Sequence, residues 1–156
     1  MALNVGDIAP EFNLVDTNKE VRTLSEFLGK KTVVAFYPAA FTGVCTKEVC
    51  SFRDSITSLN EVGAHVVAIS VDPPFSNKAF ADQNKLNFPV LSDFTRYVSA
   101  QYAGLYLDLG GVPGYTAAKR SVFVLDKSGV VKYAWIADSP AAEPNYGEVK
   151  IALAAI

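Results

Sequence analysis

The residue best suited to chemistry in this sequence is a cysteine, Cys45, at the start of a predicted helix. A dense β-branched and aromatic run at residues 32–37 ends just before it, and a helical pattern begins near Thr42. A cysteine in the first turn of a helix lies near unpaired backbone N–H groups and the positive end of the helix dipole. Both favour the thiolate, which is the nucleophilic form. We therefore expect a nucleophilic thiol here, although free cysteines often only pack in cores.

Neighbouring residues of the same loop could complete a site around this sulfur. The hydroxyl of Thr42 and nearby backbone N–H groups are donors for a bound substrate and for charge that develops on a leaving oxygen. Pro38 limits the flexibility of the loop and could screen the sulfur. Thr42 could also be an ordinary helix cap, and the two roles are compatible. The segment follows a buried strand, which is where open α/β sheets place their sites.

A second cysteine, Cys50, lies five residues beyond Cys45. In a continuous helix this spacing gives about 140° of rotation and Cα atoms about 8–9 Å apart. A disulfide needs Cα atoms about 4.4–6.8 Å apart. An internal disulfide would therefore require the first helical turn to unwind, which costs little at a helix end. Alternatively, Cys50 simply packs on the helix face.

The strands that must position this loop have two kinds of pattern. Residues 32–37 and 66–71 are continuous apolar runs, typical of central strands that are buried on both faces. Residues 12–21 carry apolar positions around a turn-like segment, which predicts a short hairpin. Residues 121–125 and 130–136 flank a four-residue turn, which predicts a second hairpin.

Helices are expected at residues 42–60, 77–85, 95–102 and 146–155. In the first of them, apolar residues recur at spacings of three and four: Val49, Phe52, Ile56 and Leu59. Strand–helix–strand followed by a hairpin and a helix indicates an α/β fold with a central mixed sheet flanked by helices.

Composition bounds the class of protein. The chain has 156 residues, which fits a single domain (residues 1–156), and half of these residues are hydrophobic. The net charge is −2 and no continuous basic stripe occurs, so we expect no nucleic-acid partner. The N-terminus has no signal-peptide pattern and the apolar runs are too short to span a membrane, so a cytoplasmic protein is expected. Two cysteines and a single histidine do not supply a four-ligand zinc site, and no metal or other cofactor is expected.

The pattern Pro38-x-x-x-Thr42-x-x-Cys45 resembles the active-site signature of the peroxiredoxin family. The likeness extends over nearly the whole chain and includes residues 6–12, 69–72, 88–93 and 119–126. Their occurrence in order along one chain argues against a chance match.

This resemblance implies a thioredoxin-like fold with an N-terminal hairpin extension and a thiol peroxidase activity on hydroperoxides. It implies that Cys45 is the peroxidatic cysteine and that Thr42 and Arg120 hold the peroxide and the thiolate. Glu48 would orient polar partners, and Pro38 would shield the site. Arg120 is too far away in the sequence for spacing to select it, although its fixed charge and donor fork suit the role. Without the resemblance, Arg120 reads as a surface residue and Glu48 as a first-turn carboxylate favoured by the helix dipole.

Two groups within the family resemble the chain in different ways. Its single-domain organisation is similar to the one-cysteine group of alkyl hydroperoxide reductase E. The spacing of Cys45 and Cys50 is similar to the bacterioferritin comigratory protein group, in which the second cysteine resolves the first. We favour that second cycle: Cys45 becomes a sulfenic acid, Cys50 condenses with it, and thioredoxin or another thiol restores both. A homodimer through the edge near the reactive loop is also implied.

Two other functions would use the same sulfur. A thioredoxin-type disulfide oxidoreductase usually has two residues between its cysteines, whereas here four intervene. A redox sensor or holdase would change its partner binding when Cys45 is oxidised, because sensor thiols are also reactive and accessible. Turnover with a reductant separates an enzyme from a sensor.

Overall fold

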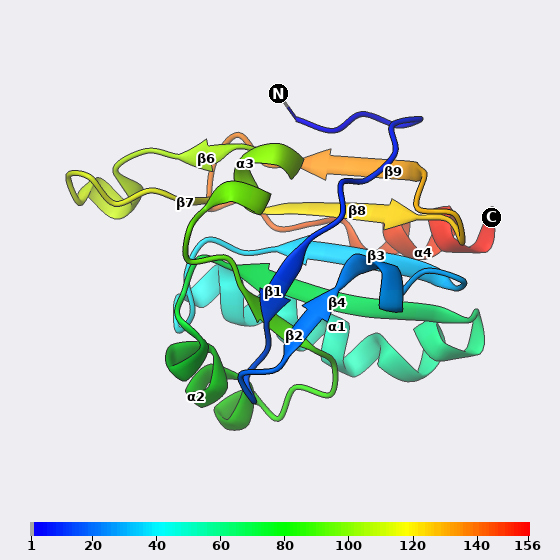
Figure 1. The fold of residues 1–156 in the computed structure, drawn as a ribbon, viewed down its shortest axis with the longest axis horizontal. Coiled ribbons are helices and arrows are strands. Elements are labelled where there is room, and N and C mark those ends of the chain that lie inside the picture. Colours follow the sequence, from blue (N-terminus) through cyan, green and yellow to red (C-terminus); the bar gives the residue numbers. More distant parts are fainter. Residues whose placement is uncertain (1) are drawn as a thin grey trace.

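The computed structural model describes residues 2–156, and the side chains of residues 56–58, which include Ile56 of the predicted helical pattern, lie outside the described part. A seven-stranded sheet runs through the molecule in the order β2-β1-β5-β4-β3-β8-β9 (Figure 1). Its strands are β1 (Asn13–Val15), β2 (Val21–Thr23), β3 (Lys31–Phe36), β4 (Ala64–Ser70), β5 (Val90–Ser92), β8 (Ser121–Leu125) and β9 (Val131–Ile136). The α-helices are α1 (Gly43–Glu61), α2 (Pro74–Asn84), α3 (Tyr97–Tyr102) and α4 (Tyr146–Ala154). Shorter elements are β6 (Leu105–Tyr106), β7 (Ala117–Ala118) and the 3-10 turns η1 (Leu24–Glu26) and η2 (Leu109–Gly111).

The sheet is mixed, as the order of elements in the sequence predicts. β3 pairs in parallel with β4, and β4 pairs in parallel with β5. β8 is antiparallel to both β3 and β9, so the predicted C-terminal hairpin is confirmed. β1 and β2 form the predicted N-terminal hairpin. The pairing of β1 with β5 connects this hairpin to the rest of the sheet. β3 therefore lies near the centre, with β4 on one side and β8 on the other.

Both faces of the sheet are covered, which explains why β3 is apolar at successive positions. Val33 and Ala35 pack in one cluster with residues of α1 and α4. Val34 and Phe36 pack on the opposite face with α3 and the N-terminal segment. In Figure 1, α1 and α4 lie behind the sheet, while α3 lies in front of it. The strand that leads into the reactive loop is thus fixed from both sides.

Some element boundaries differ from the sequence-based expectation for identifiable reasons. α2 begins at Pro74 instead of residue 77, because proline fits the first position of a helix, where no N–H donor is needed. α3 begins at Tyr97 instead of residue 95, because Arg96 has a left-handed φ of 68°. The carboxylate of Asp93 then accepts the N–H groups of Val98 and Ser99. The short strands β5, β6 and β7 were not predicted, since two or three residues carry no measurable periodicity.

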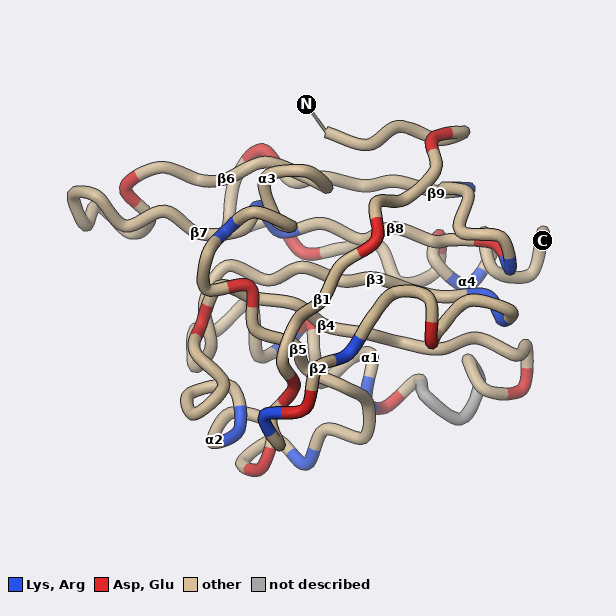
Figure 2. The backbone as a smooth tube through the Cα atoms, in the orientation of Figure 1, with Lys and Arg blue, Asp and Glu red and all other residues tan. Residues whose placement is uncertain are grey.

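Charged residues of both signs are interspersed along the chain (Figure 2). Over residues 2–156, no helix combines the length and the apolar composition that crossing a bilayer requires.

Candidate active site

The reactive loop, residues 37–42, connects the end of β3 to the start of α1. β4 runs parallel to β3 and β8 runs antiparallel to it, so β3 and β4 end, and β8 begins, at this edge of the sheet. Thr42 is the N-cap residue, with an extended backbone, and Cys45 is the third residue of α1. The first intrahelical bond at this end runs from the N–H of Thr46 to the carbonyl of Thr42. Cys45 therefore lies in the first turn, near the positive end of the helix dipole, as the sequence predicts.

The sulfur of Cys45 is buried against the guanidinium of Arg120. Cys45 is 1% exposed, and the Nη2 of Arg120 donates to its Sγ at 3.1 Å. Arg120 lies directly before β8 and is itself 2% exposed. A fixed positive charge at hydrogen-bond distance attracts a negatively charged sulfur more strongly than a neutral one. The fold thus brings together two residues that are 75 positions apart in the sequence.

Two further partners hold the guanidinium of Arg120 in place. Its Nη1 donates to the Oε1 of Glu48 at 2.8 Å, and both side chains are buried. Its Nε and Nη2 donate to the backbone carbonyl of Pro140 at 3.2 Å and 2.9 Å. Arg120 is therefore restrained from three directions, and it meets Cys45 as a fixed donor. The structure thus places Glu48, one of the sequence-predicted site residues, in contact with Arg120.

Glu48 is the most unusual ionisable group of the site, because its side chain is completely buried. Desolvation raises the pKa of Glu48 to about 8, and the attraction of Arg120 opposes this shift. Its Oε2 has no hydrogen-bond partner among the described residues. When Cys45 is a thiolate and Glu48 is protonated, the buried group of three side chains carries no net charge. A carboxylate at Glu48 would add a negative charge beside the sulfur.

Cys45 and Arg120 open into a pocket of about 280 Å³. Its walls come from the reactive loop, from the first turn of α1, from η2 and from the segment after β9: Pro38, Ala39, Thr42, Gly43, Val44, Cys45, Leu109, Gly110, Arg120, Pro140 and Ala141. These walls are mainly apolar, so the sulfur and the guanidinium are the chief polar groups that a bound molecule would meet. Pro38 and Cys45 both line this pocket.

Thr42 lies on the pocket, but its side chain does not cap the helix. Its Oγ1 donates to the carbonyl of Ala39 at 2.8 Å, and it accepts no N–H of the first turn of α1. The hydroxyl proton is therefore used inside the loop, while the oxygen keeps its acceptor capacity toward the pocket. Thr42 therefore occupies the N-cap position of α1, as expected, but its side chain makes no capping hydrogen bond.

The reactive loop is anchored to the neighbouring strand by a carboxylate. The N–H of Ala40 donates to the Oδ2 of Asp72 at 2.8 Å, and the hydroxyl of Ser70 donates to the same oxygen at 2.9 Å. Phe41 follows with a left-handed φ of 66°, a conformation that is strained for a residue with a bulky side chain. Its ring packs against Phe80 of α2, with the ring centroids 5.3 Å apart. The loop thus enters α1 through one strained residue.

The second cysteine, Cys50, lies on α1 but outside this pocket. It is half-buried, and its Sγ donates to the Oδ1 of Asn84 at 3.6 Å. Both cysteines are free thiols on one uninterrupted helix. The separation expected from helical spacing therefore applies to this state of the molecule.

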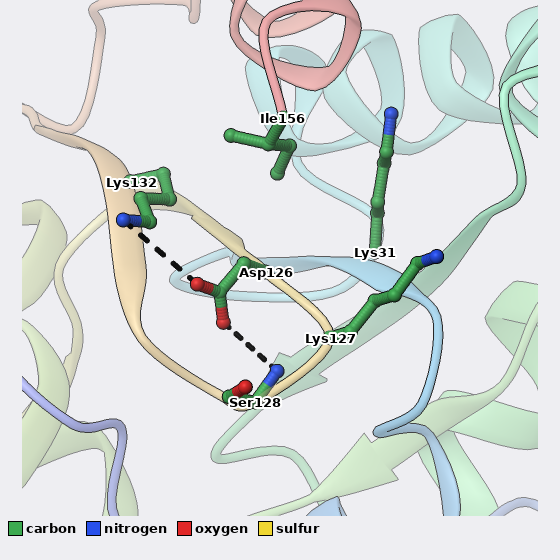
Figure 3. A pocket seen from close by; sticks show the side chains of 6 residues that line it. All are labelled: Lys31, Asp126, Lys127, Ser128, Lys132 and Ile156. Carbon is green, nitrogen blue, oxygen red and sulfur yellow. Dashed lines mark hydrogen bonds and ion pairs between the residues drawn. The ribbon is translucent and has the colours of Figure 1, made fainter.

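A larger hollow of about 440 Å³ lies at the other end of β3 (Figure 3). It is lined by Lys31, Asp126, Lys127, Ser128, Lys132 and Ile156. Several of its polar groups already have structural partners: Lys31 donates to the carbonyl of Leu153, and Asp126 accepts N–H groups in the β8–β9 turn. No cysteine or histidine lines this hollow, so the thiol chemistry of the chain is expected at Cys45.

Three parts of the site were missed by the sequence-based prediction. Leu109 and Gly110 reach the pocket from a connection whose sequence shows no regular pattern. Pro140 acts through its backbone carbonyl, a group that every residue has, so no side-chain signal could reveal it. Asp72 falls in one of the segments that resemble peroxiredoxins, yet spacing gives no reason to connect it with Ala40.

Replacement of Arg120 by glutamine should reduce the thiolate population of Cys45. Loss of a hydrogen bond to a charged group costs about 1.5–3 kcal/mol, which corresponds to roughly a 10- to 100-fold lower ratio of thiolate to thiol. Absorbance at 240 nm across pH, in a Cys50→Ser background, measures this ratio. Lys47→Gln, which removes an exposed positive charge from the same helix, is the matched control. Equal thiolate absorbance in the two variants would contradict the assigned role of Arg120.

Glu48 should make the stability of the protein depend on pH. Its pKa is raised from 4.5 to about 8, so between these values the folded state holds a proton that the unfolded state has released. The free energy of unfolding should therefore fall as pH rises from 5 to 8, by at most about 1.4 kcal/mol per pH unit from this group. Urea unfolding of the wild type and of Glu48→Gln at pH 5, 6.5 and 8 measures it. A difference between the two proteins that stays constant over this range would refute the assignment.

Comparison with known proteins shows the family to which the chain belongs. The AhpC/TSA family matches residues 5–134. The chain is 44% identical over 131 residues to chloroplastic peroxiredoxin Q of Populus jackii, covering 83% of this chain and 59% of that protein. It spans 56–59% of the length of the first three plant peroxiredoxin Q relatives. It is 38% identical over 134 residues to alkyl hydroperoxide reductase E of Mycobacterium tuberculosis, covering 85% of this chain and 84% of that protein.

Solved structures show the same fold. The crystal structure of the peroxidoxin BcpB from Mycobacterium tuberculosis superimposes with a TM-score of 0.85 at 35% identity, covering 99% of this chain and 98% of that one. A peroxiredoxin-like protein from Aquifex aeolicus gives a TM-score of 0.85 at 30% identity, covering 99% and 88% of the two chains. The expected thioredoxin-like α/β fold is therefore confirmed. Since the family match and these relatives cover most of the sequence, the chain belongs to the AhpC/TSA family of peroxiredoxins.

Proposed function

We propose that this protein is a thiol-dependent peroxidase that reduces hydrogen peroxide and organic hydroperoxides. The observation that carries the proposal is the contact of 3.1 Å between the Nη2 of Arg120 and the Sγ of Cys45 at the pocket. This contact supplies an activated nucleophile and a fixed cation at the same place. The volume of about 280 Å³ exceeds what hydrogen peroxide needs, and the apolar walls suit the carbon chain of an organic hydroperoxide.

In the first step, the Cys45 thiolate attacks one oxygen of the peroxide. A sulfur–oxygen bond forms and the oxygen–oxygen bond breaks, so the sulfur is oxidised to a sulfenic acid and the peroxide is reduced. The leaving oxygen takes up a proton and departs as water or an alcohol. Arg120 faces the charge that moves from sulfur to oxygen, the N–H groups of the first turn of α1 add further donors, and Thr42 lines the pocket for the bound peroxide. Pro38 limits the access of water.

In the second step, Cys50 resolves the sulfenic acid. Its thiolate attacks the Cys45 sulfur, a disulfide forms, and the sulfenic oxygen leaves as water with the proton that Cys50 gives up. The first turn of α1 must unwind for the two sulfur atoms to meet. Thioredoxin or another thiol then reduces the disulfide to the two starting thiols.

One measurement tests both steps. Reduced protein treated with one equivalent of hydrogen peroxide should lose about 2 Da as an internal disulfide forms, and Cys50→Ser should gain about 16 Da as a sulfenic acid. Intact mass spectrometry within minutes of mixing gives the result, and Cys45→Ser should show neither change.

Each other outcome has a definite meaning. A lasting gain of one oxygen in the wild type would leave Cys50 as a packing residue and the protein as a one-cysteine enzyme. A doubled mass would indicate resolution between subunits. An unchanged mass would contradict the peroxidase function itself, and oxidation without repeated turnover in the presence of a dithiol would favour a redox sensor.

The exposed aromatic residues beside the reactive loop support a homodimer. Phe41, Phe94 and Tyr97 are 51%, 52% and 68% exposed, and large apolar side chains at this exposure are typical of contact surfaces. Sedimentation should show twice the chain mass for the wild type. Tyr97→Asp, which would bury a charge at the interface, should weaken association by roughly 10- to 100-fold. Val21→Asp on β2, equally exposed, is the control, and a monomeric wild type would exclude the dimer.

The cytoplasm suits this cycle, because two cysteines that must return to thiols need a reducing compartment. We propose that residues 1–156 carry out the cycle as one domain, since the pocket draws on the reactive loop, η2, the start of β8 and the segment after β9.

A further inference from the structure

The thiol of Cys50 has a polar partner of its own, far from the machinery around Cys45. Asn84 is the last residue of α2, and its Oδ1 accepts the S–H of Cys50 at 3.6 Å. The Nδ2 of Asn84 donates to the carbonyl of Phe80 at 2.9 Å, one turn earlier in α2. Because that bond uses the amide nitrogen, it turns the amide oxygen toward the sulfur. The sulfur of Cys50 therefore lies against the end of α2.

A second bond fastens α1 to the same residue. Arg53, one turn beyond Cys50, donates from Nη1 to the backbone carbonyl of Asn84 at 2.6 Å. This bond satisfies one of the unpaired carbonyls at the C-terminal end of α2. Asn84 thus receives one contact from Cys50 and one from Arg53, and it joins the second and third turns of α1 to α2. The first turn of α1 is held separately, by the contact of Cys45 with Arg120.

These contacts oppose the disulfide on geometric grounds. On an intact helix the Cα atoms of Cys45 and Cys50 are about 8–9 Å apart, too far for a disulfide. The sulfur of Cys50 must turn from α2 toward Cys45 on any path to the bond, so its hydrogen bond to Asn84 is lost before the transition state. A contact that is present in the reduced state and absent in the transition state adds to the barrier.

The hydrogen bond from Cys50 to Asn84 also opposes disulfide formation on chemical grounds. The attacking species is the thiolate, whereas a carbonyl oxygen accepts a hydrogen bond only from the protonated thiol. Asn84 therefore favours the unreactive form of Cys50 for as long as the contact lasts. The positive charge of Arg53 lies on the same helix and favours the thiolate once the proton has left.

We propose that Asn84 is a positioning residue that holds the Cys50 thiol on α2 until Cys45 is oxidised, and that release of this contact contributes to the rate of disulfide formation. The inference rests on the proposed role of Cys50 as the resolving cysteine. The reaction remains balanced as written above: one disulfide forms, one water leaves, and no further oxidant is required.

Rapid mixing tests the proposal. Reduced protein is mixed with one equivalent of hydrogen peroxide, quenched with acid between milliseconds and seconds, and analysed by intact mass. Asn84→Ala should form the disulfide about twofold to tenfold faster than the wild type, the range expected from one lost hydrogen bond. The rate of the first oxidation of Cys45 should stay unchanged. Gln83→Ala, an exposed neighbour on the same helix, is the matched control and should behave as the wild type.

Asn84→Asp gives an independent readout. A carboxylate beside the sulfur disfavours the thiolate, so disulfide formation should slow and its pH profile should move to higher pH. The sulfenic acid of Cys45 should then persist, and a second equivalent of peroxide should convert more of it to the sulfinic acid, seen as a gain of about 32 Da. A purely structural role of Asn84 would not move the pH profile of this one step.

The outcomes separate the inference from the function on which it rests. A wild type that forms no disulfide would overturn both the role of Cys50 and that of Asn84. A wild type that forms it, with Asn84→Ala no faster than Gln83→Ala and the pH profile of Asn84→Asp unmoved, would overturn the role of Asn84 alone. Faster resolution in Asn84→Ala together with the shifted profile would establish it.

Discussion

The fold keeps the positive charge of Arg120 out of water beside a sulfur atom, and most of the site follows from that constraint. A buried guanidinium is costly unless its donors are paired. Its partners here are the carbonyl of Pro140, the carboxyl of Glu48 and the sulfur of Cys45. Two of these partners lie on α1 and the third lies after β9, so the charge is tolerated only when β8, α1 and the segment after β9 have packed together. The sulfur of Cys45 is one of the acceptors that pair with the buried guanidinium of Arg120.

The same helix must meet two demands that conflict. As an intact helix, α1 presents its first-turn amides to the pocket and buries Val49 and Phe52 in the core. As the carrier of two cysteines, it must open before they can join. The core contacts limit the opening, because Phe52 packs edge-to-face on Tyr146 with ring centroids 5.5 Å apart. The strained Phe41 lies two residues before the helix begins, so opening of the first turn would release this strain and leave the contact of Phe52 with Tyr146 in place.

The parts of the molecule that could be predicted from sequence are those with a local pattern. The strands at residues 31–36 and 64–70 are long apolar runs, and Cys45 lies at a recognisable helix start. Arg120 was reached only through a family signature, because no local rule connects two residues 75 positions apart. The contacts of Asn84 with α1 could not be predicted from sequence either. They form because the C-terminal end of α2 packs against the side of α1, and hydrophobic periodicity does not show which helices pack together. The strand β5 was missed because three residues are too short to show a strand pattern. Its extended conformation depends on its pairing with β4.

The long sequence separation between the sulfur and its cation has a consequence for biosynthesis. Cys45 leaves the ribosome 75 residues before Arg120 does, which at about 5–20 residues per second is a delay of roughly 4–15 s. β8 carries Arg120 into place only by pairing with β3, a non-local contact that forms late in folding. During this interval the sulfur lacks the contact with Arg120 that it has in the folded domain. The site around Cys45 is therefore assembled only when the domain is nearly complete.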